Sequence, residues 1–75
     1  MERTKTRYVI QCLTIGGRWD SGGKWEDDYT ARSLAEAREV LAEKRDEMVD
    51  PKGEIEWRYR LVERKTVVTE TVLED

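Results

Sequence analysis

The stretch "GGRWDSGGKWEDDY", residues 16–29, gathers glycines, tryptophans and acids in a spacing that resembles a ligand-binding loop. Gly23 and Lys24 look like the end of a phosphate-binding G-x-x-x-x-G-K-[ST] motif. However, Arg18 occupies the position that needs glycine, and Trp25 occupies the position that needs a magnesium-binding hydroxyl. The alternate-residue oxygen spacing of an EF-hand calcium loop is also missing among Asp20, Asp27 and Asp28. The stretch therefore predicts a hairpin loop whose glycines adopt positive φ.

Two tryptophans make this hairpin a candidate partner-binding element. Trp25 is expected to pack on the sheet, whereas Trp19 lies out in the loop. Because an exposed tryptophan fills a partner's pocket well, Trp19 and Trp25 are both candidate binding residues.

A second charged feature lies on the helix predicted over residues 34–49. At about 100° per residue, six acids project within an arc of roughly 100°. They are Glu36, Glu39, Glu43, Asp46, Glu47 and Asp50. Like charges four residues apart cost about 0.2 to 0.5 kcal/mol per pair, so this acidic ridge is a candidate surface for a basic partner, by imitation of a phosphate backbone. The alternative is a solvated face whose charge keeps the protein soluble.

The sequence "EIEWRYRLV", residues 54–62, alternates as a strand with one buried face. Arg58 and Arg60 fall on the face opposite the aromatic residues, and Arg64 and Arg7 are candidates to join them. These guanidinium groups are suited to phosphate or to a partner's carboxylates.

The sheet face that the helix leaves open is a candidate dimer or partner surface. We expect it to combine these arginines with apolar residues of the first strand and of the chain's last third. The expected apolar members are Ile10, Cys12 and some of Val62, Val68 and Val72. The alternative is a merely amphipathic surface.

Composition argues against an enzyme. The 75 residues contain no histidine, which removes the commonest general base and most zinc sites, and the single cysteine, Cys12, cannot form an intramolecular disulfide. Cys12 is best interpreted as a small core hydrophobe. We expect no catalytic residue, no metal and no cofactor.

Charge and hydropathy narrow the partner classes. A net charge of -3 disfavours a non-specific nucleic-acid binder, although a local basic patch remains compatible with it. No run approaches the roughly 18 apolar residues of a membrane span, and no signal peptide is evident. The sequence predicts a cytoplasmic protein without membrane contact.

The predicted elements form one domain over residues 1–75, with residues 1–6 and 74–75 frayed. A strand pattern covers residues 7–17 and has apolar residues on both faces, as in a central strand. A second strand pattern covers residues 24–31 and fits an edge strand, with one side formed by Trp25, Asp27, Tyr29 and Ala31. Ser33 and Glu36 form a capping box ahead of the helix, whose buried stripe is Leu34, Ala37, Val40, Leu41 and Met48, with Lys44 snorkelling inside it.

After the turn "DPKG" come the strand over residues 54–62 and a β-rich segment over 66–74, joined at 63–66 by either a tight hairpin or a bulged continuation. The fold class is α+β: a small antiparallel sheet of three to four strands with one helix packed on one face, in the order ββαβ(β).

The motifs S-L-A-E-A-R at residues 33–38 and "WRYRLVERKT" at 57–66 resemble small accessory proteins of actinobacterial phages and their hosts. The resemblance covers most of the chain from Tyr8 to Thr69. It implies a protein that binds and modulates or inhibits a host protein, as inhibitors of host defence do, in the host cytoplasm if the chain is phage-encoded. A second resemblance is to the arm-binding domains of phage integrases, but acids at positions 26–28 replace the basic residues expected there.

We therefore expect a non-catalytic protein-interaction module that meets a protein partner, one with a basic surface if the ridge binds it, with a homodimer as a further arrangement. The alternative is a small nucleic-acid-binding domain that uses Arg58, Arg60 and Arg64.

Overall fold

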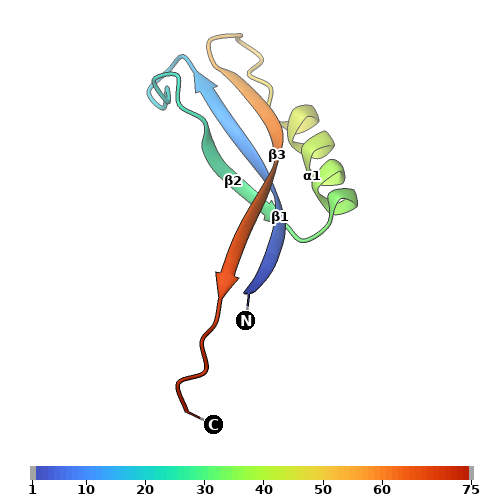
Figure 1. Cartoon of the computed structure of the whole chain (residues 1–75). Coiled ribbons are helices and arrows are strands. Elements are labelled where there is room, and N and C mark those ends of the chain that lie inside the picture. The colour runs from blue at the N-terminus through green and yellow to red at the C-terminus, as the bar shows by residue number, and fades with distance from the viewer. Residues whose placement is uncertain (1, 75) are drawn as a thin grey trace.

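The computed structural model describes residues 2–74 as a three-stranded antiparallel sheet with one helix on one face (Figure 1). The elements are β1 (Glu2–Ile15), β2 (Glu26–Ala31), α1 (Leu34–Glu47) and β3 (Glu56–Thr69), and the strands lie in the order β2-β1-β3. The α+β class and the ββαβ order are confirmed. The first strand is central and the second is an edge strand, as their hydrophobic patterns predicted. Within residues 2–74, no helix is long and apolar enough to cross a membrane.

β1 and β3 form one long antiparallel pair without interruption. Their register runs from Glu2 opposite Thr69 to Ile15 opposite Glu56. Of the two alternatives for residues 63–66, the tight hairpin is wrong, and the continuation of the strand is confirmed but without its bulge, because β1 supplies a backbone partner along the whole of β3. The shift in apolar phase has another cause: this end of β3 extends past the helix, and Val67 is 59% exposed.

The core has one layer on each side of β1. Ile10 and Val9 are both 0% exposed although they point to opposite faces. Ile10 lies on the helix side with Ala31, Ala37 and Tyr59, all buried. The prediction that both faces of the central strand are covered is confirmed.

A bulge in β2 changes which of its side chains face the helix. Ile10 pairs with Tyr29, but Gln11 pairs with Asp27, so Asp28 is an extra residue between them. One extra residue reverses the side-chain alternation. Placing Trp25, Asp27, Tyr29 and Ala31 on one side was therefore wrong: Tyr29 and Ala31 lie on the helix side, and Asp27 lies on the other.

The helix begins where the capping pattern predicted and ends two residues early, at Glu47. The Glu36 backbone N–H donates to Ser33 Oγ at 3.2 Å. The Glu36 carboxylate does not complete the reciprocal bond, because it accepts the Tyr29 hydroxyl at 2.6 Å. On the other side of the helix, Arg45 donates to the Tyr59 carbonyl at 3.0 Å and ties α1 to β3.

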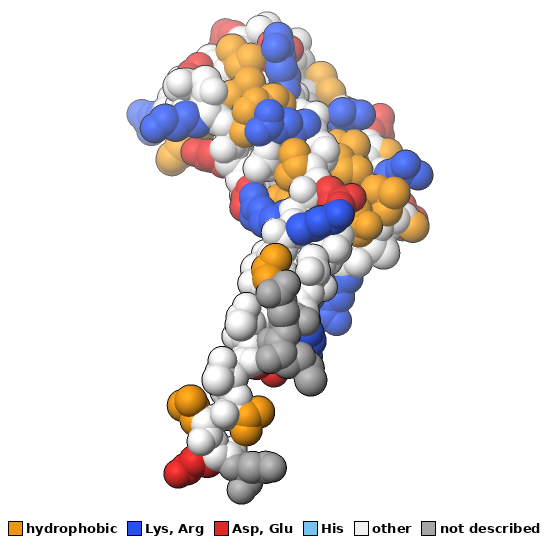
Figure 2. All heavy atoms as spheres, viewed as in Figure 1, with side chains coloured by type: hydrophobic (Ala, Val, Ile, Leu, Met, Phe, Trp, Pro, Cys, Tyr) orange, Lys and Arg blue, Asp and Glu red, His pale blue; other side chains and the backbone are white. Residues whose placement is uncertain are grey.

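The molecule is elongated, with extents of 62 × 27 × 15 Å and a radius of gyration of 17.0 Å. A compact chain of this length would have a radius of about 11 Å. The difference comes from two extended parts. One is a pair of strand ends, Glu2–Arg7 and Arg64–Thr69, which we call the ribbon, and the other is the chain after Thr69, which runs on beyond it (Figure 1). The ribbon continues past Ala31, where β2 ends, and forms the narrow region below the helix in Figures 1 and 2.

Candidate functional site

The glycine-rich hairpin is held by its own polar residues. The Asp20 carboxylate accepts the N–H groups of Gly16 and Gly22, both at 2.7 Å, and these bonds lower its pKa. Ser21 donates its backbone N–H to the Thr14 carbonyl at 2.9 Å. The prediction of positive φ at the glycines is confirmed, since all four in this loop have φ between 67° and 86°. Asp20 thus organises the loop itself.

Trp19 projects from this hairpin and is 76% exposed, so it is available to a partner. Trp25 is half-buried on the sheet, where the Arg60 guanidinium carbon lies 4.3 Å from its ring centroid. A guanidinium at this distance over an indole makes a cation–π contact. The two tryptophans are therefore not brought together into one anchor.

The sheet face opposite α1, which we call the open face, carries a continuous polar chain. From Trp25 it passes to Arg60, whose Nε donates to Gln11 Oε1 at 2.7 Å. The Gln11 amide donates to Asp27 Oδ1 at 3.0 Å. The Arg64 guanidinium donates two hydrogen bonds to the same carboxylate, of 2.8 and 3.2 Å. These side chains come from all three strands and lie on the same face as the fully buried Val9.

The hydrogen bonds of the open face shift the pKa values of Asp27 and Arg64. The hydrogen bonds from Arg64, and then from Gln11, lower the pKa of Asp27 to about 2. Asp27 in turn raises the pKa of Arg64. Both groups are therefore charged throughout the physiological range, and Asp27 partly neutralises the open face at this point.

The predicted apolar content of the open face was wrong in two positions. Cys12 pairs with Tyr59 and Ile10 pairs with Leu61, so Ile10 and Cys12 face the helix. Directly opposite residues of a ladder share a face. The arginines at positions 58, 60 and 64 instead share the open face with Val9, Leu13, Ile15, Val62 and Val68.

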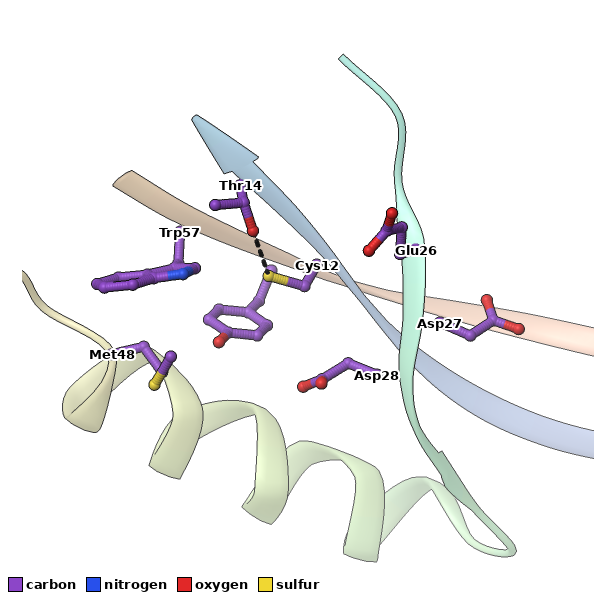
Figure 3. Close-up of a pocket in the computed structure, with 8 residues that line it drawn as sticks. Cys12, Thr14, Glu26, Asp27, Asp28, Met48 and Trp57 are labelled. Carbon is purple, nitrogen blue, oxygen red and sulfur yellow. Dashed lines mark hydrogen bonds between the residues drawn. The ribbon is translucent and has the colours of Figure 1, made fainter. Parts of the chain in front are cut away.

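A cavity of about 220 Å³ opens on the helix side, where α1 ends before the sheet does. Its wall is formed by Cys12, Thr14, Glu26, Asp27, Asp28, Met48, Trp57 and Tyr59. Figure 3 shows Trp57 and Met48 on one side of this space and Glu26 and Asp28 on the β2 side, with the Asp27 carboxylate directed away from it. Cys12 is half-buried in its floor, 3.9 Å from Thr14 Oγ1.

The cavity combines aromatic rings with carboxylates. Asp28 is paired with Lys44, whose Nζ lies 2.7 Å from Oδ2. The Lys44 side chain thus reaches from α1 to β2, and this ion pair explains why a lysine lies inside the apolar stripe of the helix. Burial, and then the Cys12 thiol and the Asp28 charge, raise the pKa of Tyr59, so its hydroxyl stays neutral. No group of residues among those that the structure describes is arranged to hold a metal ion.

The acidic side chains of the helix do not all point the same way. Helical rotation places Glu36, Glu43 and Glu47 on one edge of α1, and Glu39 and Asp46 farther into solvent. The Tyr29 hydroxyl donates to the Glu36 carboxylate at 2.6 Å, which places Glu36 beside β2. This hydrogen bond and the charge of Glu36 raise the pKa of Tyr29, and the charge of Glu43 adds to the effect.

Asp50 is not a ridge member, because the helix has ended. Its carboxylate accepts the N–H groups of Lys52, Glu54 and Ile55 at 2.9 to 3.0 Å. These bonds lower its pKa and shape the loop that leads into β3.

The ridge continues onto β2 through two acids that sequence reasoning did not select. We call the combined set the acidic seam: Glu26 and Asp28 of β2 with Glu36, Glu43 and Glu47 of α1. The missed signal was the run "WEDD", which was interpreted as an ordinary edge strand. Trp57 was missed for a different reason: it was assigned to the buried face, and it is half-buried there, but beyond the end of the helix it lines the cavity.

Comparison of the chain with protein-family models, with curated proteins and with solved structures found no match.

Proposed function

We propose that the chain is a non-catalytic protein-interaction module whose acidic seam receives a basic segment of a partner protein. The observation that carries this proposal is the cavity of about 220 Å³ beside the seam, with aromatic rings on one side and carboxylates on the other. Small-molecule sites usually measure roughly 300 to 1,000 Å³. This cavity has the size of one long side chain.

Its chemistry suits lysine or arginine. The aliphatic stem of either residue would pack against Trp57 and Met48, and its charge would meet Glu26 at the β2 edge. A cation over an indole gains cation–π energy beyond the ion pair. Because Lys44 already neutralises Asp28, Glu26 is the carboxylate that supports binding most directly.

The helix extends this cavity into a longer surface. Glu43 and Glu47 stand one turn apart on the same edge of α1, and both are exposed. Like charges at this spacing repel each other, and a basic partner would relieve that repulsion. A lysine in the cavity with further cations along α1 is the arrangement that these positions favour.

The test is the binding of a fluorescently labelled octalysine peptide, followed by anisotropy at low salt. The double variant Glu43→Lys with Glu47→Lys should weaken binding at least about tenfold, because two attractions become repulsions. The control, Glu54→Lys with Glu74→Lys, alters net charge equally at exposed sites outside the seam and should change affinity far less.

Trp57→Ala separates the cavity from general electrostatic attraction. It removes no charge, so a several-fold loss would locate a lysine side chain against the ring. Equal losses in the seam variant and its control would reduce the interaction to net charge and refute the proposal. Absence of binding to the unaltered protein at low salt would do the same.

A further inference from the structure

The fold separates charges that the sequence mixes. β1 and β3 keep one register over their whole length, so alternate residues of both strands share a face. The open face thereby receives six cations: Arg3, Lys5, Arg7, Arg58, Arg60 and Arg64. Its carboxylates are Asp27 and Glu56, with Glu70 pairing to Arg3 just beyond β3. The net charge of -3 for the whole chain therefore conceals an open face on which cations outnumber carboxylates.

The cations continue onto the ribbon, where nothing in residues 2–74 covers them. Arg7 stands directly opposite Arg64 across the two strands. Like charges in this position destabilise a strand pair, and Asp27 binds only the Arg64 side. Among the described residues, no ion pair joins Lys5 or Arg7 to a carboxylate, and the Arg7 guanidinium donates to the Thr6 carbonyl at 2.9 Å. An anion placed between these side chains would remove the repulsion.

The ribbon also has the dimensions of a groove-binding element. A two-stranded ribbon fits the major groove of a DNA duplex, which is about 12 Å wide. Six residue pairs extend roughly 20 Å at about 3.3 Å per residue. A two-stranded pair is marginally stable alone in water and gains from a surface to lie on. Its right-handed twist lets a row of cations follow a helical groove.

We propose that the ribbon lies in the major groove of double-stranded DNA, with Lys5 and Arg7 contacting phosphates at the groove's edge and Arg60 held by Trp25 over the next stretch of the backbone. Cations at every second residue form a linear row, which fits a linear polyanion better than scattered carboxylates on a globular partner. This surface is on the opposite side of the sheet from the acidic seam and is independent of it.

The experiment measures binding of a labelled 20-base-pair duplex by anisotropy from about 50 to 300 mM salt. Each phosphate contact contributes about 0.9 to the slope of log affinity against log salt. Lys5→Gln with Arg7→Gln should weaken binding at least tenfold at the lowest salt and reduce the slope by about two. Both side chains are exposed, so the variant should keep the circular dichroism spectrum of the unaltered protein.

The matched control is Arg38→Gln with Lys52→Gln, which removes two exposed cations from the helix and a loop. It should bind the duplex as the unaltered protein does. The proposal fails if the control loses as much affinity, if the unaltered protein does not bind at 50 mM salt, or if a single strand of the same length or a polyglutamate peptide binds more tightly than the duplex. Retained octalysine binding by the Lys5 and Arg7 variant would show that the two surfaces act separately.

Discussion

Gly16 and Gly22 allow the contribution of one tertiary contact to be measured against a matched control. Both glycines adopt positive φ, 86° and 67°. A Cβ at Gly22 would have open space around it, whereas a Cβ at Gly16 would lie 2.4 Å from the Glu54 backbone carbonyl oxygen. Alanine at either position incurs the left-handed strain of about 1 to 2 kcal/mol. Only at Gly16 must a second backbone segment move.

The extra cost at Gly16 follows from what holds Glu54. Its backbone N–H donates to Asp50 at 2.9 Å, so the oxygen cannot retreat without disturbing the loop that precedes β3. Overpacking of this kind costs about 1 to 3 kcal/mol. Gly16→Ala should therefore destabilise the fold by about 1 to 3 kcal/mol more than Gly22→Ala.

Urea unfolding followed by circular dichroism measures this difference. With a slope near 1 kcal/mol per molar urea for a small domain, the two midpoints should differ by about 1 M or more. Midpoints within about 0.3 M of each other would refute the reasoning, because they would mean that the two loops do not meet as the structure places them. A change in slope would instead indicate an altered unfolded state.

Further predictions concern the core, the open face and the hairpin tip. Ile10→Ala should cost about 2 to 5 kcal/mol, and Val9→Ala should cost about 1 to 3 kcal/mol in urea unfolding although it lies on the open face; a negligible loss at Val9 would show that its cover is not formed. Because the pKa of Asp27 falls to about 2, below its usual 3.8, its contribution to stability is present above about pH 4 and is lost as pH decreases toward 2. Carboxyl NMR titration of Arg64→Gln should show the Asp27 pKa rising, and an unchanged value would refute the pairing. Trp19→Ala should leave the free energy of unfolding within about 0.5 kcal/mol of its original value, and a larger loss would mean that the ring packs in solution.

Local patterns were sufficient for the type of each element, because this depends on nearby residues. They were not sufficient for the bounds of β1, predicted over residues 7–17 and observed over Glu2–Ile15, because its first residues pair with the distant end of β3. Ser33 predicted the start of the helix, since its hydroxyl bonds a backbone group three residues away. The strict alternation before Val62 predicted the buried face of β3. The central position of β1 followed from apolar residues on both of its faces, which only a covered strand can bury.

The candidate site was only partly predictable. Trp19 was correctly placed in an exposed loop, and the acids of α1 were found from helical rotation alone. The cavity could not be found this way, because it exists where the helix ends before the sheet and leaves Trp57 only half-buried. The bulge at Asp28 was also missed, since a single extra residue shows itself only in the pairing with β1.

The sequence by itself determined the type and order of the elements, because capping, turn chemistry and periodicity act over a few residues, but it left open whether the sheet has three strands or four. Only the tertiary structure decided which charges share a surface. The register between β1 and β3 joins residues about 40 to 70 positions apart, and it moves the cations of both strands to one side of the sheet while α1 and β2 gather acids on the other. A one-residue slip in that register would turn the cations of one strand to the helix side, and the hydrophobic pattern alone cannot show the register.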